Sequence, residues 1–179
     1  MNKYLKVIFL SAVLLIPIVI FLFLKTFGEN KFDIPIYYEE GKPDHWQDCS
    51  ADSKNDQYMV KFDEDKLPSA VLFLKQTQSF QSLEVSNITN RLQDAVSGMT
   101  YITYTYDSAL AEENKQLNYL DSSQFVKQMR CNFVTDTVNQ FVLIDSKKRI
   151  RGYFDTERDE IDRLIVEMKI LLENERNNK

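Results

Sequence analysis

The sequence is poor in the residues that most often carry out chemistry in proteins. It has one histidine, two cysteines and four glycines among 179 residues. The histidine, His45, precedes the predicted domain, so a hydrolase triad would have no base there. The cysteines, Cys49 and Cys131, are too far apart in the sequence to form a CxxC redox pair. We therefore expect no catalytic residues, no cofactor, no small-molecule substrate and no enzymatic activity.

Reactive residues are also missing from the turn where an α/β protein usually carries them. The carboxyl end of a central strand that leads into a helix commonly holds ligand-binding groups. Residues 75–81 follow the predicted central strand 70–74 and read KQTQSFQ. They include no Cys, His, Asp, Glu or Gly to bind a metal, attack a carbonyl or cradle a phosphate.

Acidic residues outnumber basic ones beyond residue 25. Residues 1–25 hold three of the 22 basic residues (Lys3, Lys6 and Lys25) and none of the 27 acidic ones, so the rest of the chain has a net charge of −8. Such a surface repels phosphate groups, and nucleic acid is not expected as a partner.

What the sequence does have is one long apolar run. Residues 7–24 are 18 residues without a charge, which is long enough to cross a bilayer. Two lysines precede the run and one follows it, so the positive-inside rule places the N-terminus in the cytoplasm. A cleaved signal peptide is the alternative, but the run exceeds a usual signal and no small-x-small cleavage site follows it. We expect residues 1–25 to form an uncleaved transmembrane anchor.

The remaining chain divides into a lead-in and one domain. Residues 26–57 mix turn-forming and acidic residues and predict a stalk and irregular lead-in, whereas residues 58–179 alternate strand-like and helical patterns. The expected strands are residues 58–62, 70–74, 99–106, 140–144 and 149–154, and the expected helices are residues 83–96, 108–129 (one broken helix or two short ones) and 156–172.

The order of these elements predicts the fold class. From Ala70 onward it is β-α-β-α-β-β-α, and the short polar turn at residues 145–148 makes the last two strands an antiparallel hairpin. Right-handed crossovers place the helices on both faces of a four-stranded mixed sheet. We expect an α/β protein with a thioredoxin-like fold.

Residues 141–172 resemble the C-terminal end of SCO1/SenC family sequences; they read FVLIDSKKRIRGYFDTERDEIDRLIVEMKILL. Members of that family are thioredoxin-like copper proteins involved in cytochrome oxidase assembly. The resemblance implies a bacterial inner-membrane protein, crossing once, with its C-terminal domain in the periplasm.

The copper ligands of that family are missing here. The family has a CxxxC pair after the first core strand and a histidine before the third, and soft thiolates with an imidazole suit copper. Residues 75–90 lack a cysteine, and Asp136-Thr137 stands where the family has Asp-His. The resemblance therefore implies a degenerate member without copper or disulfide exchange.

Two further sets of residues are candidates. In an oxidising compartment Cys49 and Cys131 either form a disulfide or remain two buried thiols. His45 and Cys49 have a spacing that suits two metal ligands on one helical turn, but a metal site needs three or four, so no metal is expected.

A basic cluster stands out on the acidic domain. It consists of Lys147, Lys148, Arg149 and Arg151. These residues are either a solvated hairpin tip or a docking patch for an acidic partner.

Two functions follow from these observations. The first is a membrane-anchored, non-catalytic protein that serves as an accessory or assembly partner of a membrane complex, with a respiratory oxidase as the candidate that the resemblance implies. The alternative is an active copper-handling or thiol-redox protein that uses Cys49 and Cys131.

Overall fold

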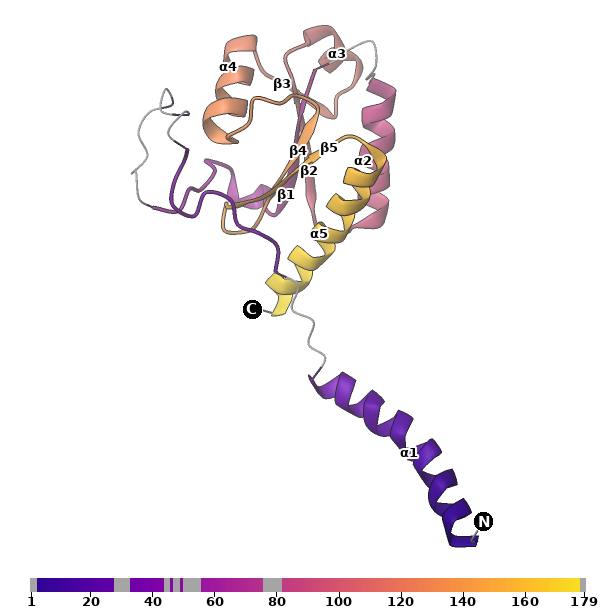
Figure 1. Cartoon of the computed structure of the whole chain (residues 1–179). Helices are drawn as coiled ribbons and strands as arrows, with labels where there is room; N and C mark the ends of the chain where they lie inside the picture. The colour runs from indigo at the N-terminus through magenta and orange to yellow at the C-terminus, as the bar shows by residue number, and fades with distance from the viewer. Residues whose placement is uncertain are drawn as a thin grey trace. The chain divides into compact units, whose positions relative to one another are not determined.

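The computed structural model describes residues 3–27, 33–43, 46, 49, 56–75 and 82–177 (Figure 1). The chain divides into two units, Met1–Phe32 and Asp33–Lys179. The second unit therefore includes, from Asp33 onward, most of the lead-in predicted at residues 26–57.

The first unit contains one helix, α1 (Lys3–Phe27), which is 25 residues long and includes Pro17. Its apolar side chains are exposed around the helix, for example Phe9 at 69%, Leu14 at 64% and Phe21 at 66%. A search limited to the described residues finds no helix with the length and apolarity needed to cross a bilayer. The helix predicted near the N-terminus is present, but its transmembrane character is not supported by that search.

The second unit is built on a five-stranded mixed sheet in the order β3-β2-β1-β4-β5. Strands β1, β2 and β3 are parallel, and β4 is antiparallel to both β1 and β5. Leaving out β3, the order and polarity are those of the predicted thioredoxin-like core, and the mixed α/β class is confirmed. The strands are β1 (Ser69–Leu74), β2 (Thr100–Thr105), β3 (Leu117–Tyr119), β4 (Gln140–Ile144) and β5 (Ile150–Asp155).

Helices cover both faces of this sheet, because the central strand β1 is apolar on both. Ala70, Leu72 and Leu74 pack in one cluster with residues of α2 and α5. Val71 and Phe73 pack in another cluster with residues of α4, the π-helical turn η3 and the lead-in. Figure 1 shows α2 and α5 on one side of the sheet and α4 on the other. The bounds are α2 (Ser82–Ala95), α4 (Ser122–Lys127), η3 (Gln128–Asn132) and α5 (Arg158–Asn177).

The segment predicted as helix at residues 108–129 is only partly helical. It forms α3 (Ser108–Glu113), the edge strand β3, α4 and the start of η3. The carboxylate of Asp107 accepts a hydrogen bond from Leu110 N, and that of Asp121 accepts two at the start of α4. These two N-caps start separate helices and leave room for a strand between them.

The strand predicted at residues 58–62 is wrong. This stretch is irregular, with Tyr58 N donating to Tyr38 O at 3.0 Å and Val60 N donating to Lys148 O at 2.8 Å. The apolar alternation that predicted a strand reflects side chains buried against the sheet, since Tyr58 and Val60 are 5% and 1% exposed. A short η2 turn (Glu64–Lys66) follows it.

Tyr101 joins β2 to the end of α2. Its hydroxyl donates to Leu92 O at 2.9 Å and lies 3.1 Å from Val96 O. Burial raises the pKa of Tyr101 from 10.0 to about 12. Because the unfolded chain loses this proton first, the stability that the group contributes should be lost as the pH rises from about 10 to about 12. Chemical denaturation at several alkaline pH values should show the free energy of unfolding falling as the pH rises, and falling less for Tyr101→Phe. An equal dependence on pH for both proteins would contradict this prediction.

Gly152 lies in β5 where a side chain has no room. A Cβ there would come within 2.6 Å of the ring of Phe154, which is 1% exposed. We expect Gly152→Ala to lower the free energy of unfolding by roughly 1–3 kcal/mol, because a buried ring must move. Urea unfolding measures this, with the exposed Val166→Ala as control. A loss no larger than that of the control would contradict the prediction.

Candidate functional site

Asn139 clamps the backbone at the carboxyl end of β1, the end of the strand after which the family resemblance would place copper ligands. Asn139 N donates to Phe73 O at 2.8 Å. The Asn139 side chain accepts from Lys75 N at 2.8 Å and donates to Lys75 O at 3.0 Å. This clamp holds the loop before β4 against the first residue after β1; residues 76–81 lie outside the described part of the chain.

Asn139 is not among the candidate residues singled out from the sequence. Its φ of 57° is left-handed, a conformation that asparagine tolerates better than most residues. In the same loop Thr135 is buried and its hydroxyl lies 3.2 Å from Gln140 Oε1, while Asp136 is exposed. Among the described residues no group of three or more His, Cys, Asp and Glu side chains could hold a metal.

The two cysteines are joined. Cys49 of the lead-in and Cys131 of η3 form a disulfide with a Cα–Cα distance of 5.1 Å across 82 residues of sequence. Of the two alternatives for this pair, the structure therefore has the disulfide. His45, with Asp44 and Asp48, lies outside the described residues, so the His45–Cys49 arrangement stays untested.

Hydrogen bonds reinforce the same junction between the lead-in and η3. Lys42 Nζ donates to Cys131 O at 2.6 Å, and the Tyr58 hydroxyl donates to Asn132 O at 2.8 Å. The Asn132 side chain accepts from Lys61 N at 2.7 Å and donates to Lys61 O at 2.9 Å. The disulfide is thus the covalent part of a larger attachment of the lead-in to the domain.

A cavity of about 440 Å³ adjoins the disulfide. The lead-in contributes Trp46 and Cys49 to its wall. Helix α4 and the turn η3 contribute the opposite wall, made by Ser122, Ser123, Val126, Lys127, Arg130 and Cys131. Both cysteines are only partly buried, so the disulfide itself is part of the cavity surface.

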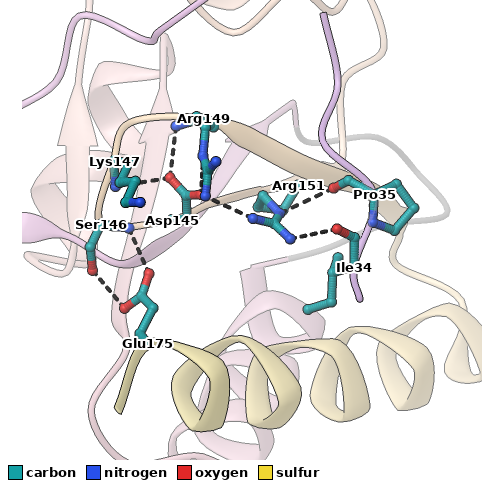
Figure 2. Close-up of polar contacts among 8 residues, drawn as sticks. All are labelled: Ile34, Pro35, Asp145, Ser146, Lys147, Arg149, Arg151 and Glu175. Carbon is teal, nitrogen blue, oxygen red and sulfur yellow. Dashed lines mark hydrogen bonds and ion pairs between the residues drawn. The ribbon is translucent and has the colours of Figure 1, made fainter. Parts of the chain in front are cut away.

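The predicted basic patch is divided by burial. Figure 2 shows the carboxylate of Asp145 between the guanidinium groups of Arg149 and Arg151, at 2.7 Å and 3.1 Å. Arg151 is 7% exposed and also donates to Pro35 O at 3.1 Å and to Ile34 O. Its role is to bind the start of the lead-in.

Arg151 is therefore buried away from any exposed docking patch. Lys147 is exposed, and Lys148 and Arg149 are partly exposed, so docking by these three residues stays a prediction. Glu175 of α5 supports the same hairpin tip, accepting from Ser146 N at 2.8 Å and from Ser146 Oγ at 2.6 Å (Figure 2).

No family model matches the chain, and no curated protein matches it. Among solved structures, the chain is similar to the crystal structure of a SCO1/SenC family lipoprotein from Bacillus anthracis str. Ames, with 13% sequence identity, a TM-score of 0.47, and coverage of 61% of this chain and 84% of that chain.

Proposed function

We propose that this protein is a membrane-anchored, non-catalytic thioredoxin-fold protein of SCO type that binds a partner in a membrane complex as an accessory or assembly subunit. A respiratory complex is the candidate that the family resemblance suggests. The observation that carries the proposal is the disulfide, because it uses both cysteines of the chain to attach the lead-in. The scaffold then has contact surface to offer rather than thiolates.

The proposed anchor is α1. Its large apolar side chains from Phe9 to Phe23 are at least half exposed on all sides of the helix, and a helix that is apolar all round needs an apolar environment. We place its N-terminus in the cytoplasm on the basis of Lys3 and Lys6. The domain would then lie in the periplasm, an oxidising compartment in which a disulfide persists.

A second function, thiol-redox or copper chemistry, is favoured by one observation. Cys49 and Cys131 are partly exposed at a cavity, so a small reductant or a metal ion could reach the sulfurs. Against it, the two sulfurs supply at most two ligands, and the described residues include no group of three His, Cys, Asp or Glu side chains that could hold a metal.

Gentle extraction of native membranes tests the proposed function. The tagged full-length protein should migrate in a complex larger than itself, and its capture should enrich the same membrane subunits in repeated mass-spectrometry runs. The control is a chain with α1 replaced by an unrelated anchor. A tagged protein that always migrates alone would refute the proposal.

A further inference from the structure

The cavity beside the disulfide has the size and composition of a binding site. Its volume of about 440 Å³ lies within the range of roughly 300–1,000 Å³ typical of ligand pockets. Trp46, Val126 and the disulfide provide apolar surface. Lys127 and Arg130 provide two positive charges on the same side.

Val126 is an apolar side chain that the fold does not use for its own core. Its neighbour Phe125 is 2% exposed and packs under the sheet, whereas Val126 is 46% exposed. Trp46, only 8% exposed, lines the same cavity from the lead-in. An exposed aliphatic group and a fixed indole in one cavity offer a partner side chain a place to bury apolar surface.

Two positive charges, Lys127 and Arg130, adjoin this apolar surface. No ion pair involves Lys127 or Arg130 among the residues that the structure describes, and the Arg130 guanidinium lies 5.4 Å from the centre of the Trp46 ring. The chain beyond residue 25 has a net charge of −8, so these two cations form a local positive region on a chain that is negative as a whole. Local positive charge of this kind selects an acidic ligand.

We propose that the cavity is the docking site for an acidic segment of the partner protein. An aliphatic or aromatic side chain of that segment enters between Trp46 and Val126, and flanking carboxylates pair with Lys127 and Arg130. This inference rests on the proposed function and names the surface and the chemistry of its partner.

The disulfide has a defined part in this site. Cys49 fixes the wall that carries Trp46, and Cys131 fixes the wall that carries Arg130 and Val126. A site prearranged in this way loses less conformational entropy on binding. Binding should therefore weaken when the two walls are no longer joined.

Fluorescence of Trp46 tests the proposal, because it is the one tryptophan of the chain and lies in the cavity wall. The full chain in a neutral maltoside detergent is titrated with the capped pentapeptide Asp-Glu-Leu-Glu-Asp. The same peptide with glycine for leucine, and one with lysine for each acidic residue, are the controls. We expect saturable binding of the first peptide alone.

Variants locate the binding. The double variant Lys127→Gln with Arg130→Gln should lower the affinity for the first peptide by about tenfold or more. The matched double variant Lys115→Gln with Lys169→Gln, on exposed lysines elsewhere, should leave that affinity unchanged. Calorimetry repeats the measurement, since Arg130 adjoins the reporting indole. Equal binding of the basic peptide, or equal affinity of both double variants, would overturn the inference.

Capture separates this inference from the proposed function. If the double variant Lys127→Gln with Arg130→Gln no longer captures the partner, both the proposed function and this docking site are supported. If that variant captures the partner as well as the parent protein does, the proposed function stands and this docking site is wrong.

Discussion

Replacing Cys131 with serine is expected to lower the free energy of unfolding by roughly 2–5 kcal/mol. The disulfide closes a loop across 82 residues of sequence, so removing it gives the unfolded chain much more conformational freedom. It also releases Cys49 and the wall of the lead-in that carries Trp46. Urea unfolding of the full chain in neutral detergent, followed by Trp46 fluorescence, measures the loss.

Matched variants show whether this loss belongs to the covalent link. Cys49→Ser should be destabilised to a similar extent, and the double variant should be no worse than either single one, because one bond is removed in each case. Ser122→Ala, on the cavity wall but outside the disulfide, should change little. A Cys131→Ser variant as stable as the parent protein would show that the lead-in is held by its hydrogen bonds alone.

Asp145→Ala is expected to be at least as damaging, with a loss of roughly 3–5 kcal/mol. The Asp145 side chain is 2% exposed and pairs with Arg149 and Arg151. It also accepts hydrogen bonds from the backbone N–H groups of Lys147 and Arg149, each at 2.9 Å, which shape the hairpin tip. Removing it leaves the Arg151 guanidinium buried without its counter-charge.

Two comparisons make this second prediction specific. Glu175→Gln keeps an acceptor for Ser146 N, while its amide NH₂ can donate to Ser146 Oγ, so this variant should lose less than about 1 kcal/mol. Adding Arg151→Met to Asp145→Ala should recover part of the loss, because the uncompensated buried charge is then gone. If the single variant unfolds like the parent protein, Asp145 does not organise this end of the domain.

The elements with a clear period were predictable from the sequence. The uninterrupted apolar run of β1 predicts a strand covered on both faces, and the recurrence of Val85, Leu92 and Val96 predicts the buried stripe of α2. The short polar turn at residues 145–148 predicts the β4–β5 hairpin. Each of these signals is local, so periodicity alone is enough to read it.

The contacts that define the candidate sites are long-range and could not be read in this way. Arg151 looks like part of an exposed basic cluster, yet it binds the carbonyls of Ile34 and Pro35, which are 117 and 116 residues away in sequence. The cavity likewise joins Trp46 to Arg130 only after folding. The three-residue strand β3 is too short to show a period.

The proposed function depends most directly on the two cysteines having a structural rather than a chemical role. The test is to extract the full-length protein from native membranes, expose it to copper(I) under mild thiol reductant, and count reactive thiols and bound copper per chain. We expect no thiol that reacts before unfolding and no copper retained after dialysis. One tightly held copper per chain that disappears with Cys49→Ser would contradict it.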